Sequence, residues 1–291
     1  MVRSPSRSRA RRSPPWSPRR SAVITTRSAA LFEIDGNVLV PSDLTRGGWT
    51  DYTQHGGPPC GILARAVESV PTLVPMMVVR FTVDLIRPVT LEPLRVETRV
   101  IREGKRIQLV DGVLLHGETE LGMVRALKIR IGEVDLPEHQ TDTMPFGPES
   151  LGALDWAGHF GEKDELHRFH YDAVEIRTSE RSFVEPGPGI SWFRLRVPLV
   201  EGEVPTPFVT MATLADMANG NGQSLDPTVH SFVNPDLSLH LHRYPVGEWI
   251  GMRSQSHPHP HGVGMADTTL YDADGRIGRV IQSQLIDHRS R

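Results

Sequence analysis

The alternation of apolar and polar residues predicts a fold that is rich in strands and poor in helices. Long Val-rich runs alternate in polarity and are separated by short turns marked by Gly or Pro, which is typical of an antiparallel meander. In the first half the runs occupy residues 31–41 (with a turn at Asp35-Gly36), 76–89, 94–102, 106–117 and 121–132. In the second half they occupy residues 169–178, 190–199, 230–243, 247–256, 265–272 and 277–287.

Two stretches follow a helical pattern instead. In residues 55–70, "HGGPPCGILARAVESV", glycines and prolines open a run whose apolar side chains recur at helical spacing. A second helix is predicted at residues 207–219. Residues 133–168 are richer in Pro, Gly, Asp and Glu, and we interpret them as a linker between two sets of elements.

The recurring order of elements indicates an internal repeat. "FTVDLIRPV" begins at Phe81, and "LSLHLHRYPV" begins 156 residues later, at Leu237. The same offset places "LGMV" (121–124) on "IGRV" (277–280) and the first helix on the second. We therefore predict an α+β double hotdog fold, in which each copy has a long helix packed on an antiparallel sheet. The predicted domains are residues 31–132 and 169–288.

Several short motifs carry a family resemblance. They are "HGGPPCGILARA", "VDLIRPV" and "REGKR" in the first copy, and "GPGISWFRLR", "TLADMAN", "PDLSLHLHR" and "DADGRIGRVIQSQLI" in the second. In their order and spacing, residues 30–288 resemble the acyl-CoA thioesterase-like proteins with tandem hotdog domains, which include the type II acyl-CoA thioesterases. The resemblance implies a hydrophobic tunnel for an acyl chain between the hotdog units.

The resemblance also implies a water-activating site built from an Asp, a Ser or Thr, and a Gln of the second copy. The Asp falls on Asp216 and the Gln falls on Gln282. The Ser/Thr position falls on Asn234, which departs from the pattern: Asn can orient a water but has no hydroxyl group. The efficiency of hydrolysis therefore stays open at this position.

The repeat offers a comparison that does not need the family. The positions 156 residues before Asp216, Asn234 and Gln282 hold three apolar or weakly polar residues: Cys60, Val78 and Ala126. Packing alone would permit the apolar set in both copies, so the polar set favours a chemical role. A general base at Asp216 would contribute roughly 10²–10⁴-fold in rate.

Each of these residues has a simpler interpretation. Asp216 could lie on an exposed helix face, as most helical Asp residues do. Gln282 and Gln284 lie on the same side of a predicted strand and could both face solvent. Asn234 fits a turn, in which case Ser231 or Ser238 would supply the hydroxyl group.

Gly56 and Gly57 are candidate substrate-binding residues. A helix start presents free backbone N–H groups, which could stabilise the oxyanion that forms from a thioester carbonyl. Alternatively, the glycines only provide a tight start for the helix. His55 shows no partner in the sequence, and we assign it no catalytic role.

Two further features suggest chemistry that we do not favour. "HPHPH" at 257–261 suggests a metal, but its prolines favour a polyproline helix that spreads the histidines around the axis. We interpret it as a loop and predict no metal site. Cys60, the single cysteine, has no readable catalytic partners and fits a buried apolar position.

Composition limits the remaining possibilities. The net charge is −3, and residues 1–30 hold eight Arg without any Asp, Glu or Lys, so the rest of the chain carries −11. An acidic body argues against nucleic-acid binding. The single cysteine is consistent with a reducing compartment, and no apolar run reaches the length of a membrane span. We expect a cytoplasmic protein with a disordered tail at residues 1–30.

The first hypothesis is an acyl-CoA thioesterase of lipid metabolism, which uses water held by Asp216, Gln282 and Asn234. It needs no cofactor, since coenzyme A enters as part of the substrate, and it works as a monomer of two hotdog units or as a homo-oligomer. The alternative is a non-catalytic hotdog module that binds acyl thioesters or another hydrophobic ligand. A hotdog hydratase is a third option, although the sequence shows no Asp/His pair at the spacing that hydratases use.

Overall fold

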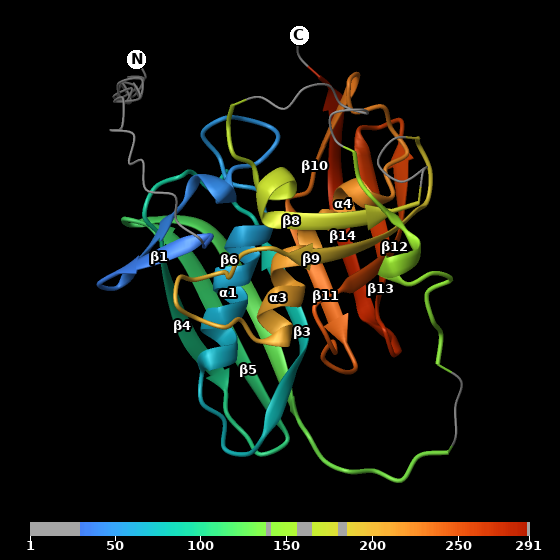
Figure 1. The fold of residues 1–291 in the computed structure, drawn as a ribbon. Coiled ribbons are helices and arrows are strands. Elements are labelled where there is room, and N and C mark those ends of the chain that lie inside the picture. Colours follow the sequence, from blue (N-terminus) through green and yellow to red (C-terminus); the bar gives the residue numbers. More distant parts are fainter. Residues whose placement is uncertain (1–29, 138–140, 156–164, 180–184, 290–291) are drawn as a thin grey trace, which may run out of the picture.

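A computed structural model describes residues 30–137, 141–155, 165–179 and 185–289 (Figure 1). The tail predicted for residues 1–30 lies outside these ranges except for Ala30. Over the described residues, the chain forms one large curved sheet with two neighbouring helical segments packed across it (Figure 1).

Twelve strands of the described residues form one sheet in which neighbouring strands are antiparallel. The first half supplies β3 (Met76–Asp84), β4 (Arg95–Arg102), β5 (Ile107–His116) and β6 (Thr119–Arg130). The second half supplies β7 (Gly152–Ala153), β8 (Val174–Thr178), β9 (Gly189–Leu195), β10 (His230–Val233), β11 (Asp236–Leu241), β12 (Ile250–His259), β13 (Val263–Asp272) and β14 (Gly275–His288). Their order is β4-β5-β6-β3-β11-β14-β13-β12-β9-β8-β7, with β10 paired to β14, so β3 and β11 join the two halves.

Three regions differ in detail from the sequence predictions. The first predicted strand is a separate hairpin of β1 (Phe32–Asp35) and β2 (Val38–Pro41), whose turn contains Gly36 at a positive φ of 60°. The strand predicted at 169–178 instead begins with a π-helical turn, η3 (Phe169–Ala173), before β8. The stretch interpreted as a linker contains η2 (Pro148–Ser150) and the short strand β7.

The predicted repeat has a geometric counterpart at the junction of the halves. Thr82 of β3 lies directly opposite Ser238 of β11, and the two hydroxyl groups are 3.3 Å apart, at a sequence separation of 156. Two antiparallel strands related by a twofold axis must place equivalent residues opposite each other at that axis. The bounds of β5 and β13 are also related by this same offset. The two copies are therefore arranged about an approximate twofold axis between β3 and β11.

The helices of the two copies differ. The first is α1 (Gly57–Ser69), a continuous α-helix with Pro58 and Pro59 in its first turn, where a missing N–H costs little. The second copy has α3 (Pro207–Leu214), a 3-10 turn η4 (Ala215–Met217) and a short α4 (Ala218–Asn221). A second long α-helix is therefore not confirmed. None of the helices in the described residues is long and apolar enough to cross a membrane.

Local chemistry accounts for the interrupted second helix. Thr206 caps α3 by accepting a hydrogen bond from the Val209 N–H at 3.1 Å, which starts the helix at Pro207. The Thr213 hydroxyl donates to the Val209 carbonyl at 2.8 Å, a bond that competes with regular helical geometry. Gly220 and Gly222, near its end, have low helix propensity. The 3-10 turn that results contains Asp216.

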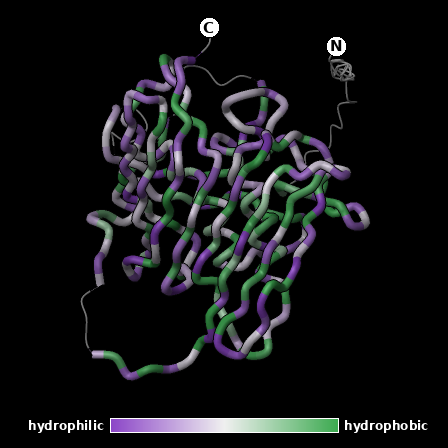
Figure 2. Tube along the Cα trace, turned by 180° about the vertical axis from the view of Figure 1, so that it is seen from behind, coloured by the Kyte–Doolittle hydropathy of each residue, from purple (hydrophilic) through white to green (hydrophobic). Residues whose placement is uncertain are grey.

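The core lies between the helices and one face of the sheet. Seen from behind, the opposite face has no helix in front of it, and hydrophilic and hydrophobic residues alternate along its strands (Figure 2). On β11, Leu237 and Leu239 are fully buried, whereas His240, the residue after Leu239, is exposed. This period of two fixes which side chains meet α1 and α3.

A buried ion pair anchors the far end of the second copy. Asp272 of β13 is 2% exposed and accepts hydrogen bonds from the Arg243 guanidinium and from the backbone N–H groups of Val246 and Asp274. Burial raises the pKa of Asp272, but the Arg243 hydrogen bond and the backbone N–H groups lower it below the ordinary aspartate value. The carboxylate is therefore held ionised in the folded protein.

We expect Asp272→Asn to lower the free energy of unfolding at pH 7 by about 2–4 kcal/mol, because it leaves a half-buried guanidinium without its counter-charge. Since the folded pKa is depressed, the carboxylate stabilises the protein above the unfolded pKa of about 4 and loses that effect as the pH falls through the folded value. Denaturant unfolding at pH 7 and pH 3 checks both points. An equal difference between wild type and variant at the two pH values would contradict the ion-pair explanation.

Candidate active site

A cavity of about 1060 Å³ opens where α1 begins and where the second-copy helical segment turns at η4. Both copies contribute to its wall. Its apolar lining includes Trp49, Leu85, Val89, Met217 and Phe232, and its polar lining includes His55, Asp216, Asn219 and Asn234. This volume and mixture of side chains are typical of a small-molecule site.

Asp216 is the centre of a buried polar cluster in this wall. Asp216 is only 6% exposed, so the interpretation that it lies on an exposed helix face is wrong. Oδ1 accepts hydrogen bonds from Asn234 Nδ2 at 2.7 Å and from Gln282 Nε2 at 3.1 Å. Oδ2 lies 3.0 Å from His55 Nδ1, and the Gly56 backbone N–H also bonds to the carboxylate. The structure thus brings the three family-implied residues together.

This cluster keeps Asp216 ionised. Burial raises the pKa of Asp216, but the attraction and hydrogen bond of His55, together with hydrogen bonds from Asn234 and the Gly56 N–H, lower it below the ordinary aspartate value. A buried carboxylate with a depressed pKa is a negative charge fixed in place. Such a charge can orient or stabilise a positively charged partner.

The two glutamines of β14 have different partners. Both are buried and face the helices: Gln282 contacts Asp216, whereas Gln284 Nε2 donates to Asn219 Oδ1 at 2.8 Å. Asn219 Nδ2 in turn donates to Asn234 Oδ1 at 3.1 Å. The solvent-facing interpretation of the glutamines is therefore wrong. Gln282 holds the carboxylate directly, and Gln284 supports it through the two asparagines.

His55 is the site residue that the sequence analysis missed. It precedes α1, lines the cavity, and is 19% exposed at its side chain. Its ring packs against Phe169 at 4.9 Å between centroids and lies 6.1 Å from the ring of His170. Its partner Asp216 is far away in the sequence and comes from the other copy. The only signal in the sequence was a histidine directly before two glycines.

The two glycines lie in different surroundings. Gly56 lines the cavity, and a Cβ placed on it would lie 2.7 Å from Asp216 Oδ2. Gly57 is buried, and a Cβ there would lie 2.4 Å from the Thr213 carbonyl oxygen. Pro58 and Pro59 have no N–H, so the helix start presents few backbone donors. Oxyanion binding by the glycines stays a prediction.

Cys60 is buried next to the cluster. Burial, and to a lesser degree the charge of Asp216, raise the pKa of the Cys60 thiol well above its ordinary value. A thiol that resists ionisation is a poor nucleophile. Cys60 therefore packs as an apolar residue at the repeat position of Asp216.

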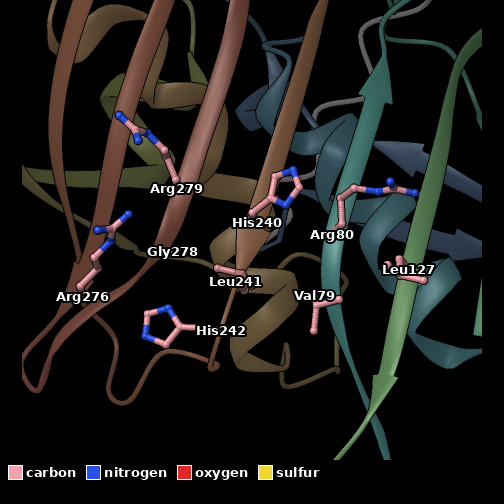
Figure 3. Close-up of a pocket in the computed structure, with 9 residues that line it drawn as sticks. All are labelled: Val79, Arg80, Leu127, His240, Leu241, His242, Arg276, Gly278 and Arg279. Atoms are coloured by element: carbon pink, nitrogen blue, oxygen red, sulfur yellow. The ribbon is translucent and has the colours of Figure 1, made fainter. Parts of the chain in front are cut away.

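A second hollow, of about 660 Å³, lies on the sheet face away from the helices (Figure 3). Its lining includes Arg80 of β3, His240 of β11, His242 just after β11, and Arg276 and Arg279 of β14, and none of the Asp216 cluster lines it. None of the described residues in its wall is an Asp or a Glu, so we place no thioester there. Across the described residues there is no group of three or more His, Cys, Asp or Glu side chains that could hold a metal ion.

Solved structures share the fold. An acyl-CoA thioesterase II, TesB2, from Mycobacterium marinum is 15% identical over 90% of this chain and 97% of that chain, with a TM-score of 0.63. The tesB protein of Mycobacterium avium subsp. paratuberculosis is 17% identical over 88% and 95%, at 0.60. A conserved hot dog protein of unknown function from Alicyclobacillus acidocaldarius is 13% identical over 90% and 97%, at 0.66.

Comparison with protein-family models identifies the family of the chain. No curated protein matches the chain. The family model of the acyl-CoA thioesterase N-terminal domain matches residues 45–129, and that of the acyl-CoA thioesterase C-terminal domain matches residues 143–286. The two matches cover more than three quarters of the sequence and follow each other in chain order. The chain therefore belongs to the acyl-CoA thioesterase family whose members join these N- and C-terminal domains.

Proposed function

We propose that this chain hydrolyses acyl-CoA or related acyl thioesters in the cavity at the start of α1. A water activated at the Asp216 cluster would attack the thioester carbonyl, with Gln282 and Asn234 holding the carboxylate. The observation that carries the proposal is the buried, ionised Asp216 in the wall of the cavity, bonded to both family-implied amides. The proposed function requires no cofactor besides coenzyme A in the substrate.

The cavity suits such a substrate. Apolar side chains from both copies, including Leu85 and Met217, offer a surface for an acyl chain. Arg87 and Arg289 line the same cavity and are exposed, so their guanidinium groups can meet the phosphates of coenzyme A. The polar cluster lies within the same cavity wall, where a thioester carbonyl could reach it.

The proposal is tested by measuring thioester hydrolysis across acyl-CoA chain lengths, with the released free thiol as the readout. We expect wild-type turnover, and we expect Gln282→Met to lower kcat by about 10-fold or more, because the substitution removes one hydrogen bond to a buried charge. Gln284→Met is the matched control: it has similar volume and burial but does not contact Asp216, and it should retain more activity than Gln282→Met.

Absence of wild-type turnover on every chain length would contradict the proposal and favour the non-catalytic binding module.

One observation also favours a second enzymatic candidate, because His55 and Asp216 form an Asp–His pair that can activate water. Such a pair could add water to the double bond of a 2-enoyl thioester. Loss of the enoyl absorbance without thiol release would identify this hydratase activity.

A further inference from the structure

Protein donors already surround the Asp216 carboxylate. An ionised carboxylate offers about four lone-pair sites. In this cluster, four donors surround it: Asn234 Nδ2 and Gln282 Nε2 on Oδ1, His55 Nδ1 on Oδ2, and the Gly56 N–H. A base must contact the proton that it takes, and its affinity for that proton must be adequate. The four donors around Asp216 and its depressed pKa both argue against Asp216 as the general base.

We propose that His55 is the general base that contacts the hydrolytic water and that Asp216 acts through His55 as a positioning residue. This inference rests on the proposed function of the same site. It differs from the family-implied arrangement, in which the carboxylate and the amides hold the water themselves.

The tautomer of His55 follows from its partner. The Gly57 N–H lies 3.1 Å from His55 Nδ1, and Asp216 Oδ2 lies 3.0 Å from the same nitrogen. One ring nitrogen cannot accept from the first and donate to the second at once. The charge-assisted bond to an ionised carboxylate is the stronger, so it selects the imidazole that carries hydrogen on Nδ1. The lone pair then resides on Nε2, for which the described residues provide no hydrogen-bond partner.

The surroundings hold the ring in this orientation. Phe169 packs against it from the π-helical turn η3, and the side chain remains 19% exposed toward the cavity. Among the described residues, Asp216 from η4 and His170 from η3 are titratable groups close to the ring. Gly56 matters here because a Cβ at that position would meet Oδ2, the oxygen that bonds to His55. The base comes from the first copy and its carboxylate from the second.

The chemical step balances with these groups alone. The Nε2 lone pair takes one proton from water as the water oxygen bonds to the thioester carbonyl carbon, and the carbonyl π electrons move to its oxygen. When the tetrahedral intermediate collapses, the C=O bond forms again and the C–S bond breaks. The imidazolium returns its proton to the departing thiolate, which gives one carboxylic acid and one thiol. Asp216 stays ionised and stabilises the transient imidazolium.

Steady-state hydrolysis by His55→Ala and His55→Gln, with and without added imidazole, tests the inference. We expect kcat to fall by about 10²–10⁴-fold in both variants, with a smaller change in KM. Added imidazole should restore part of the kcat of His55→Ala, because the small base can occupy the vacated volume, but it should not restore His55→Gln. His240→Ala, on the opposite sheet face, is the control and should keep the wild-type kcat.

A double variant separates a shared role from two independent ones. If Asp216 acts through His55, the fold-loss of kcat in the double variant His55→Gln/Asp216→Asn should be far smaller than the product of the fold-losses in the two single variants. Two results would overturn the role of His55 while leaving the thioesterase proposal intact. One is a near-wild-type kcat in both folded His55 variants. The other is a lower kcat/KM that comes only from a higher KM and that imidazole does not restore. Absence of wild-type turnover would instead overturn the proposed function and this inference with it.

Discussion

Replacing Asp216 with Asn is expected to lower kcat for thioester hydrolysis by about 10²–10⁴-fold. The amide has nearly the volume of the carboxylate, so packing is preserved. It has no charge, however, and it turns one acceptor oxygen into a donor that faces the Asn234 and Gln282 amides or the His55 ring. Whether Asp216 takes the proton itself or orients His55, the variant loses the charge on which either role depends.

Steady-state kinetics at a temperature where each variant is folded measure this effect. Asp272→Asn is the matched control, since Asp272 is another buried carboxylate of the second copy with a depressed pKa. It belongs to an ion pair with Arg243 and does not line the cavity. We expect Asp272→Asn to lose stability and keep kcat, and Asp216→Asn to lose kcat. A folded Asp216→Asn enzyme with wild-type kcat would show that the catalytic group lies elsewhere.

The repeat was the part of the structure most accessible from the sequence. Alternating apolar positions and a constant offset predicted the strands, and Thr82 and Ser238 confirm that offset by lying opposite each other at the junction. The offset also contrasted Asp216 with Cys60, and both are buried. A pattern of this kind is readable because it depends on local periodicity and on the comparison of one half of the chain with the other.

Contacts between the copies were not readable in the same way. His55 had no visible partner because Asp216 approaches it only when the two copies fold together. The interrupted second helix also escaped prediction, since its apolar residues at 207–219 continue the helical pattern through the 3-10 turn η4. Side-chain hydrogen bonds such as that of Thr213 to the Val209 carbonyl alter a helix without changing its apolar period.

The close approach of the two helices should be as important for catalysis as the polar cluster itself. Gly57 of α1 faces its repeat equivalent, Thr213 of α3, and a Cβ on Gly57 would lie 2.4 Å from the Thr213 carbonyl oxygen. Backbone atoms cannot turn aside as a flexible side chain can, so Gly57→Ala must push the helices apart. We expect it to lower the free energy of unfolding by about 1–3 kcal/mol.

The same displacement should lower kcat by about 10²-fold, because His55 and Gly56 immediately precede Gly57 and meet Asp216 across this contact. Kinetics and denaturant unfolding of Gly57→Ala measure the two effects. Gly132→Ala is the control, since a Cβ there meets no atom within 4 Å, and it should change neither quantity appreciably. If Gly57→Ala lost stability but kept the wild-type kcat, the spacing of α1 and α3 would serve packing alone, and the cluster would tolerate movement between the two copies. A parallel loss of both would show that this spacing positions His55 against Asp216.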